Sequence, residues 1–355
     1  MKSVISKIVA PRKAEFFEEE LPPVGSKDML IKMDAVGLCH SDIPAYIGSS
    51  VVQIHKDYKF REPVDPVYPV AVGHEAVATV LEVGSDVKRF KVGDKVSGRV
   101  RQCFRDYMHI PDCDVLAPTI QLFVIPPTEK DYRYCLAEPL EDIVNIARFV
   151  NPEFGQNVAV VGCGAMGLLS ICALRHTAAK RIVAVDVLDN KLELAKEFGA
   201  THTVNPLNIK NMSETSYLLT EGMFFDVVLE ITGSIRGLDT AMQMIKYTHK
   251  DGHTVNQYMG SGRVMLSSVY SKEEVFPARL GFNMMVRTPV MYALHPTISV
   301  DPMSNELEGI AAFIDGRLPM EKLITHHVPF AEMTRALEYL VEAPADYIKG
   351  IVTFD

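Results

Sequence analysis

The sequence predicts an α/β protein of two domains, one β-rich and one built on a doubly wound parallel sheet. Three observations lead to this prediction. The chain has 355 residues, more than one hydrophobic core normally serves. Its first third alternates between short apolar strands and turn residues. From about residue 157 the pattern changes to apolar strand, glycine turn, helix and strand, which is typical of a βαβ unit.

The β-rich part contains strand candidates such as MLIKMDAVGL, AVATVLEVG and KVGDKVSGRV, separated by Gly and Pro. The second part begins with NVAVV, a glycine turn, the helix LLSICALRH and the strand RIVAVD. A helix over 190–198 ends at Gly199, as a C-terminal capping glycine would end it, and the strands THTVN and FFDVVLEITG follow. Such continuous apolar runs are typical of buried parallel strands. An amphipathic helix over 330–341 and a closing strand, IKGIVTFD, complete the chain.

We therefore expect a β-rich domain made of residues 1–145 with 288–355, and a parallel-sheet domain over 146–287.

The net charge of -9 and the lack of long basic runs argue against nucleic acid or an anionic membrane as the main partner. No apolar run reaches the roughly 18 to 20 residues of a spanning helix, and the start MKSVISKIVAPRK lacks a signal-peptide core. These features predict a cytoplasmic protein that acts on small molecules. The six cysteines form no C-x-x-C pair and are expected to be free thiols.

Gly162, Gly164 and Gly167 form G-x-G-x-x-G between an apolar strand and a helix, the context in which this motif binds a dinucleotide. The glycines allow a tight turn, a close approach of backbone to pyrophosphate and packing of helix on strand. Asp186 ends the next strand 24 positions after Gly162, near the roughly 20 expected for the acid that binds the adenosine ribose. A carboxylate there repels a 2′-phosphate, which favours NAD over NADP. We add Met166 and Lys191 as flanking contacts, and expect a Rossmann domain.

The β-rich part contains a dispersed set of metal-binding side chains: Cys39 in GLCHSD, His74 and Glu75 in VGHEAVATV, and Glu138 in LAEPLE. Singly, each is explained as a buried thiol, a surface imidazole or a solvated carboxylate. Together, a thiolate, an imidazole and carboxylate oxygens suit zinc, and catalytic zinc sites keep one position open for water or substrate.

These segments resemble the zinc-dependent medium-chain dehydrogenases, most closely the sorbitol and polyol dehydrogenase branch. The resemblance covers nearly the whole chain and rests on GLCHSD, YPVAVGHE, VGSDVKRFKVGDKV, the tripeptide EPL, VAVVGCGAMGLL with RIVAVD, and LITHHVPFAEMTRALEYL. It implies a GroES-like β-rich catalytic domain joined to the Rossmann domain, and a homo-oligomer, either a dimer or a tetramer.

The resemblance also implies residue roles. Cys39, His74 and Glu75 would bind a catalytic zinc, with Glu138 as a fourth group, either directly or through water. Ser41 matches the hydroxyl that relays the substrate proton. Zinc would polarise the alcohol oxygen, and hydride would pass reversibly to NAD.

The chain departs from the family pattern in two places. Ala78 replaces the last glycine of GHE-x-x-G, which should affect local packing more than the metal. Many relatives carry a lobe with four cysteines that binds a structural zinc. Here only Cys103 and Cys113 occur in that region, and two thiols cannot close a tetrahedral site. We therefore predict one catalytic zinc per chain and no structural zinc.

Three alternatives stay open at this point: a sugar-alcohol-phosphate dehydrogenase similar to the galactitol phosphate enzyme, a zinc-free quinone or enoyl-type reductase, and a non-catalytic NAD-binding sensor. Arg99, Arg101 and Arg105 cluster in sequence and could bind a phosphate or another anion, but we favour their interpretation as a solvated surface. Tyr46 and the neighbourhood of Arg287 are candidate substrate-pocket residues. The substrate itself does not follow from the sequence.

Overall fold

The computed structural model describes residues 1–49, 51–54, 61–116, 120–128, 131–246, 262–268, 275–287, 289–294, 302–314, 316–318 and 320–354. It forms two compact units. The first comprises residues 1–139 and 320–355, and the second comprises residues 140–319.

The first unit is β-rich, as the sequence predicts. Within the described residues its main sheet has seven strands in the order β16-β17-β3-β6-β7-β9, and β8 also pairs with β3. The strands are β3 (Met29–Gly37), β6 (Glu75–Val83), β7 (Lys95–Val100), β8 (Tyr107–Ile110), β9 (Ile120–Ile125), β16 (Ile324–Pro329) and β17 (Lys349–Thr353). Strands β3, β6, β7 and β9 are antiparallel neighbours, and only β16 and β17 pair in parallel. This arrangement brings residues from both ends of the chain into one sheet.

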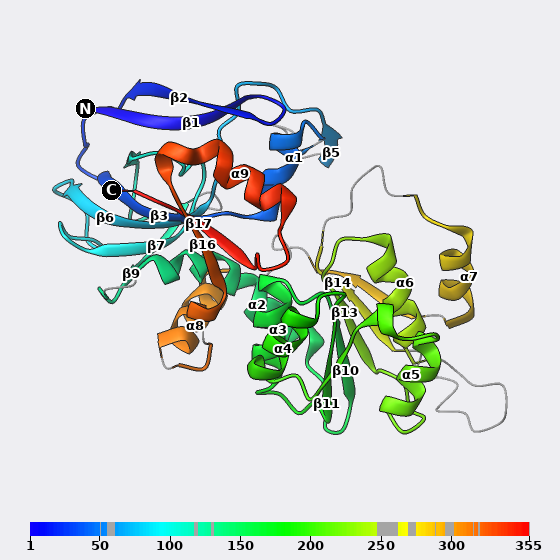
Figure 1. Ribbon diagram of the computed structural model, residues 1–355. Coiled ribbons are helices and arrows are strands. Elements are labelled where there is room, and N and C mark those ends of the chain that lie inside the picture. The colour runs from blue at the N-terminus through cyan, green and yellow to red at the C-terminus, as the bar shows by residue number, and fades with distance from the viewer. Residues whose placement is uncertain are drawn as a thin grey trace. The chain divides into compact units, whose positions relative to one another are not determined.

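Smaller elements cover this sheet. The strands β1 (Lys2–Ala10) and β2 (Lys13–Glu20) form a hairpin, β4 (Val51–Ile54) pairs with β5 (Arg61–Val64), and the short helix α1 (Ile43–Ile47) follows the turn η1 (His40–Asp42). Helix α9 (Met333–Glu342) packs against β2, β16 and β17, and Figure 1 shows it lying under the hairpin in the first unit. Its apolar face buries Met333, Ala336, Leu337 and Leu340, the spacing of one side of a helix.

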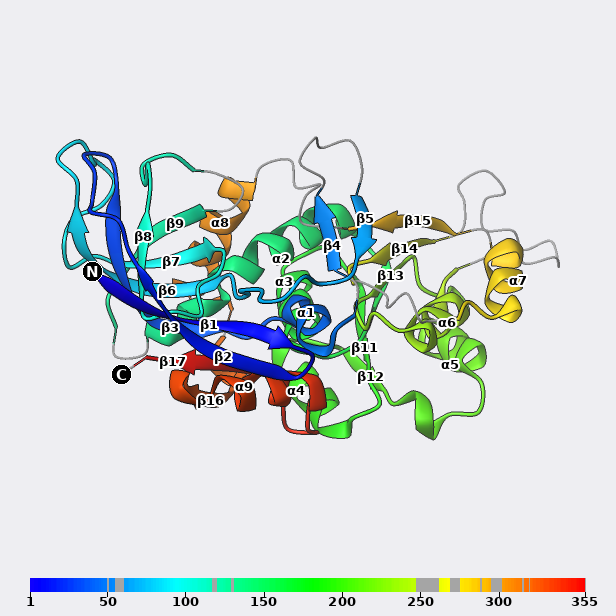
Figure 2. The same cartoon turned by 90° about the horizontal axis from the view of Figure 1, so that it is seen from above.

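The second unit contains a six-stranded sheet, within the described residues, in the order β12-β11-β10-β13-β14-β15. These strands are β10 (Asn157–Val161), β11 (Arg181–Val185), β12 (His202–Val204), β13 (Val227–Glu230), β14 (Arg263–Leu266) and β15 (Val290–Ala293), and every neighbouring pair is parallel. Figure 2 shows β13, β14 and β15 side by side. The sheet confirms the predicted Rossmann-like fold.

Helices cover both faces of the parallel sheet. The helices α3 (Ala165–Leu174) and α4 (Asp189–Phe198) pack together on one face, and α5 (Met212–Leu219) and α6 (Ile235–Met244) pack together on the other (Figure 1). The remaining helices of this unit are α7 (Ala278–Arg287), which contacts α6, and α8 (Pro302–Ile314). The turn η2 (Asp131–Leu136) leads into α2 (Ala137–Val150), which starts in the first unit and ends in the second. The predicted helix over 190–198 therefore exists, beginning one residue earlier, and Gly199 ends it at φ 113.

The two units divide at other residues than the expected domain boundaries. Strand β15 pairs in parallel with β14 and so belongs to the second unit, although residues 288–355 were assigned by sequence to the β-rich domain. The pattern changes too little after residue 287 for the sequence to reveal a sixth strand. Among the described residues, no helix combines the length and the apolar character needed to cross a bilayer.

Candidate functional site

The structure brings Cys39, His74 and Glu75 together in the first unit. The thiol sulphur, an imidazole nitrogen and a carboxylate oxygen all lie within 4.8 Å of one another. Cys39 and His74 are half-buried, whereas Glu75 is buried. The described residues contain no other such group of three. Three of the four dispersed side chains that the sequence singled out are therefore close together in space, and Glu138 is not in this group.

Strand pairing explains this convergence. Glu75 is the first residue of β6, directly after His74, and it lies opposite Gly37 on β3 and opposite Arg99 on β7. Cys39 follows the end of β3 and begins the turn η1. The end of β3 and the start of β6 lie side by side, and this pairing brings the thiol, the imidazole and the carboxylate together although they are distant in sequence.

Asp42 connects the two ligand-bearing segments. Its carboxylate is buried and accepts hydrogen bonds from the backbone amide of Cys39 (3.4 Å) and from that of Gly73 (3.1 Å). One of its oxygens, Oδ1, also lies 3.8 Å from Nδ1 of His74. This separation is longer than a hydrogen bond, so the contact between Asp42 and the imidazole is electrostatic. Asp42 stands inside the GLCHSD segment, but the sequence alone did not indicate this role.

Glu75 is paired with Lys349, the first residue of β17. The Lys349 Nζ atom lies 2.6 Å from Oε1 and 2.6 Å from Oε2 of Glu75, and it donates a hydrogen bond to Oε1. Burial by itself lowers the pKa of Lys349, but the charges of Glu75 and Cys39 outweigh it and raise this pKa above its ordinary value. Oε2 of Glu75 is buried and has no hydrogen-bond partner among the described residues. Its contact with the Lys349 ammonium is therefore an ion pair without hydrogen-bond geometry.

Glu138 lies in the first turn of α2 and is paired with Arg99. The guanidinium contacts one carboxylate oxygen twice: Nε and Nη2 of Arg99 lie 2.8 Å and 2.6 Å from Oε1 of Glu138. Burial raises the pKa of Glu138, but the charges of His74 and Arg99 outweigh burial and hold that pKa below its usual range. The predicted fourth group is thus near the site and ionised, yet it is not part of the group of three.

His74 lies among negative groups. Burial lowers the pKa of His74, but the interactions with Cys39, Glu138 and Asp42 outweigh it and raise that pKa well above its ordinary value. The donor set of a thiol, an imidazole and a carboxylate within one small cluster fits zinc.

Ser41 lies two residues beyond Cys39, within η1, and is exposed. Its hydroxyl is therefore accessible to solvent.

Tyr46 was a candidate pocket residue, but it is fully buried and donates a hydrogen bond to Glu338 at 2.8 Å. The assignment of Tyr46 is corrected, because its side chain packs inside the first unit. Arg287, whose neighbourhood was the other candidate, is buried in the second unit, where it donates to the carbonyl of Ile245 and the hydroxyl of Ser213.

The arginine cluster is also divided by the fold. Arg99 pairs with Glu138, and Arg105 is buried with its guanidinium 3.3 Å from Glu19. Arg101 is exposed in the turn after β7. Alternation along the strand and the turn beyond it send these neighbours in different directions. They do not form one anion-binding group.

The glycine loop of the second unit has the predicted arrangement. Gly162 follows β10 with φ 106, Gly164 precedes α3, and Met166 and Gly167 belong to the first turn of that helix. Asp186 follows β11, and its Oδ2 accepts the amide of Cys163 at 2.7 Å while Oδ1 accepts the amide of Leu188 at 2.9 Å. The carboxylate is thereby held at the carboxyl end of the sheet, next to the loop.

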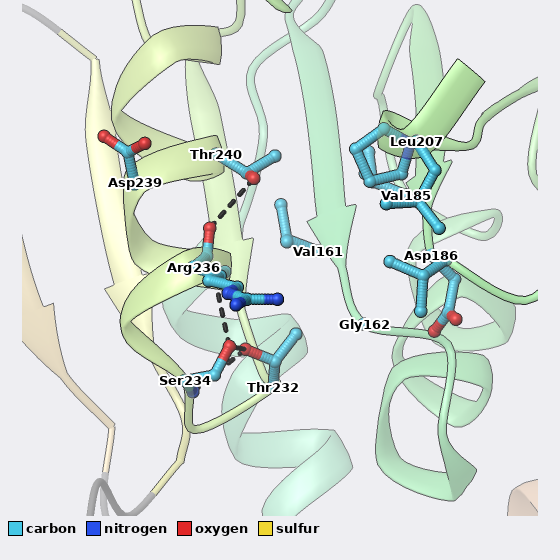
Figure 3. A pocket seen from close by; sticks show the side chains of 13 residues that line it. Val161, Gly162, Val185, Asp186, Leu207, Thr232, Ser234, Arg236, Asp239 and Thr240 are labelled. Carbon is cyan, nitrogen blue, oxygen red and sulfur yellow. Dashed lines mark hydrogen bonds between the residues drawn. The ribbon is translucent and has the colours of Figure 1, made fainter. Parts of the chain in front are cut away.

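A pocket of about 480 Å³ opens beside Asp186 (Figure 3). Of the predicted cofactor residues, Gly162 and Asp186 line it, whereas Gly164, Met166, Gly167 and Lys191 do not. Figure 3 shows the Arg236 side chain on the side facing Asp186, with Val161 between them. The other lining residues are Val185, Val187, Pro206, Leu207, Thr232, Ser234, Gly237, Asp239 and Thr240. This size and mixed lining suit a small organic ligand.

Sequence reasoning missed several side chains of these sites. Lys349, Arg99 and Asp42 carry charge next to the group of three, and Arg236 lines the pocket. Asp42 lies three residues after Cys39, so its nearness in sequence to a candidate ligand could have indicated its role. Arg99 had been singled out only as a member of the arginine cluster. Lys349 lies 274 positions from Glu75, and only the sheet order shows that they meet.

Comparison with known proteins agrees with both units. A family model described as the alcohol dehydrogenase GroES-like domain matches residues 25–117, and one described as zinc-binding dehydrogenase matches residues 165–257. A zinc-type alcohol dehydrogenase-like protein of Escherichia coli strain K12 is 24% identical over 99% of each chain. L-threonine 3-dehydrogenase of Escherichia coli O1:K1 is 29% identical, over 68% of this chain and 74% of its own.

Among solved structures, galactitol-1-phosphate dehydrogenase from Escherichia coli superposes with a TM-score of 0.75. It covers 99% of this chain and 100% of its own at 19% sequence identity. At that identity the likeness concerns the fold.

Proposed function

We propose that this chain, which belongs to the zinc-dependent medium-chain dehydrogenase family, reversibly oxidises a secondary alcohol or polyol and transfers the hydride to NAD. The observation that carries the proposal is the convergence of Cys39, His74 and Glu75 within 4.8 Å. Three donors of these types suit a catalytic metal, because catalytic zinc sites take three protein ligands and keep a fourth position open. The glycine loop in the second unit supplies a nucleotide site.

Cys39, His74 and Glu75 are the residues that would hold the zinc. When bound there, zinc supplies Lewis-acid polarisation of an alcohol oxygen. Asp42 places a carboxylate beside the imidazole and ties both ligand segments together by accepting hydrogen bonds from their backbone amides. Lys349 fixes the Glu75 carboxylate in its buried position. These contacts hold the donors in place before any substrate binds, which is what a preorganised site requires.

Ser41 is the residue that we assign to the substrate proton. Its hydroxyl can accept a proton on one side and donate one on the other, and its exposure gives it access to water. It is two residues from Cys39, so it stands near the reacting oxygen if Cys39 binds the metal. A Ser41→Ala variant should bind metal normally and turn over more slowly.

NAD is the cofactor that we favour. The Asp186 carboxylate is held beside the pocket by two backbone amides, which leaves it able to accept from a ribose hydroxyl. A 2′-phosphate at the same place would meet a fixed negative charge. Titration with NAD and with NADP tests this preference directly.

We propose an unphosphorylated substrate, in line with the resemblance to the sorbitol and polyol branch. Arg99 and Arg105 already have carboxylate partners, so the arginines next to the candidate ligands are not arranged as a phosphate site. L-threonine 3-dehydrogenase and galactitol-1-phosphate dehydrogenase indicate which other substrates to include in a screen.

The first experiment is a substrate panel at fixed NAD and zinc. It should contain polyols, their phosphates, simple secondary alcohols and L-threonine, with formation of NADH as the readout. We expect the largest kcat/KM for a compound with a secondary hydroxyl and no phosphate. A preference for a sugar-alcohol phosphate would replace that part of the proposal, and no turnover with any alcohol would favour an NAD-binding sensor.

The second experiment addresses the metal. Cys39→Ser and Glu75→Ala should abolish turnover and lower the zinc content, while NAD binding stays close to that of the wild type. Arg101→Gln, a change at an exposed residue in the turn after β7, serves as the control. Full activity in a preparation without metal would favour the zinc-free reductase.

We retain the expected homo-oligomer, a dimer or tetramer, and the single zinc per chain as parts of this proposal. Sizing chromatography and elemental analysis test them.

A further inference from the structure

We infer that Arg99 is a positioning residue that withholds Glu138 from the metal, so that Cys39, His74 and Glu75 are the only protein ligands and the fourth position stays open to the alcohol. The inference rests on the proposed zinc site. It concerns the contact between Arg99 and Glu138, which lies beside that site within the first unit.

The geometry of the pair is the first argument. Both Nε and Nη2 of Arg99 point at the same oxygen of Glu138, Oε1, at 2.8 Å and 2.6 Å. The pair is largely shielded from water, since the side chains are 15% and 9% exposed. Charge-assisted hydrogen bonds of this kind are short and about twice as strong as neutral ones. The two contacts hold Oε1 on Arg99, and this restrains the positions that Oε2 can reach.

The position of Glu138 is the second argument. Glu138 is close enough to His74 for its negative charge to contribute to the raised pKa of the imidazole. Nevertheless its oxygens are outside the 4.8 Å group that Cys39, His74 and Glu75 form. Glu138 is therefore near the site but displaced from it, and the cation that contacts it is Arg99.

The backbone around the pair is the third argument. Arg99 lies on β7 directly opposite Glu75 on β6, so the same strand pairing that places a ligand also places the guanidinium. The turn before α2 is anchored to the same strand, because the Ser97 hydroxyl donates to the carbonyl of Tyr134 at 2.6 Å. Both partners are thus set by β7, and neither depends on a metal for its position.

The experiment compares four proteins: wild type, Arg99→Gln, Glu138→Gln and the double variant. The readouts are zinc per chain and the rate at which a chelator removes it. Removing the guanidinium leaves a buried carboxylate without this partner, and a metal held by Cys39, His74 and Glu75 would be a cation that it could contact instead. We expect Arg99→Gln to lose zinc about tenfold more slowly, the scale on which groups behind the ligands alter metal affinity. Glu138→Gln and the double variant should lose zinc at the wild-type rate.

Cobalt substitution gives a second readout. With cobalt in place of zinc, the visible absorption of Arg99→Gln should change in intensity and position, because an added carboxylate ligand alters the coordination. The spectrum of the double variant should return to that of the wild type. Arg99→Lys keeps the charge but cannot contact Oε1 with a fork of two donors, so its zinc release should lie between those of wild type and Arg99→Gln. Arg101→Gln is the matched control and should match the wild type in both readouts.

The outcomes separate the two proposals. A wild-type chain that binds no zinc refutes the proposed metal site itself. If wild type binds zinc but Glu138→Gln alone loses it faster, Glu138 is a ligand and our inference is wrong. The inference also fails if Arg99→Gln releases zinc as fast as wild type while the variants fold. Thermal unfolding checks folding, and the double variant, which removes both charges, guards against a general loss of stability.

Discussion

Gly37 and Glu75 lie opposite each other on strands β3 and β6, and the side chain of Glu75 fills the space that a Cβ on Gly37 would occupy. A methyl group built on Gly37 would stand 1.9 Å from Oε2 of Glu75 and 3.0 Å from its Cβ. The side chain of Glu75 therefore lies against the backbone of β3, and it can adopt this position only because residue 37 has no side chain.

Gly37→Ala should displace the Glu75 carboxylate without removing any donor atom. We expect zinc affinity to fall about 10- to 100-fold, the effect of disturbing a group that orients a ligand. Forcing a methyl into this packed region should also cost about 1–3 kcal/mol of stability. Gly281→Ala is the control, since its methyl would meet only an ordinary contact at 3.6 Å. Unchanged zinc affinity in Gly37→Ala would show that Glu75 does not contribute to metal binding.

Two glycines of the nucleotide loop should respond differently to the same change. In Gly167→Ala the new methyl would stand 1.9 Å from the carbonyl oxygen of Gly162, so the helix α3 cannot keep its place. We expect a loss of about 1–3 kcal/mol in urea unfolding. A methyl group added to Gly164 would meet no atom within 4 Å, and the residue has a φ of -71, so Gly164→Ala should fold normally. The same methyl would stand where the pyrophosphate is expected to approach the backbone, so the variant should bind NAD more weakly. Equal NAD affinity in Gly164→Ala and wild type would argue against a close approach of pyrophosphate at that residue.

Asp186→Asn tests the preference for NAD. Asparagine keeps the shape of the side chain but removes the charge, so the ribose hydroxyl loses a charged acceptor and a 2′-phosphate meets less repulsion. The ratio of NAD to NADP affinity should fall by about tenfold, as measured by calorimetric titration of both nucleotides. Lys191→Gln is the comparison, because Lys191 does not line the pocket. An unchanged ratio in Asp186→Asn would contradict the ribose assignment.

The thiols should differ in reactivity. Of the six cysteines, Cys39 alone is not buried. Burial and the nearby Asp114 raise the pKa of Cys113 to about 11, and burial raises the pKa of Cys103 and Cys135 as well. At pH 8 only roughly one part in a thousand of Cys113 is the reactive thiolate. Iodoacetamide should therefore modify Cys39 first in zinc-depleted protein.

Two further observations check that prediction by mass spectrometry. Added zinc should protect Cys39 if it is a ligand, whereas protection absent at saturating zinc would contradict the assignment. Modification of Cys113 should rise as the pH increases toward 11, because a raised thiol pKa keeps the group protonated at lower pH. Rapid labelling of Cys113 at pH 8 would show that this part of the first unit opens readily.

The nucleotide half of the protein was predictable because its signals are local. A buried strand, a glycine turn and a helix follow one another within 157–174, and Asp186 ends the next strand. Each of these features depends on residues that are neighbours in the chain. The second unit's edge strand β15 was not predicted, because a short partly exposed strand has no strong pattern of its own.

The sequence singled out Cys39, His74 and Glu75 because a thiol, an imidazole and a carboxylate together suit zinc, and the resemblance to the zinc-dependent dehydrogenases implied their role as ligands. Only the tertiary structure decided what surrounds them. Lys349 meets Glu75 because β17, from the end of the chain, pairs with β3, and Arg99 meets Glu138 because β7 carries both the arginine and the anchor of the next turn. Charge pairing across strands depends on sheet order and register, which arise from packing the whole domain and are not encoded within any one segment.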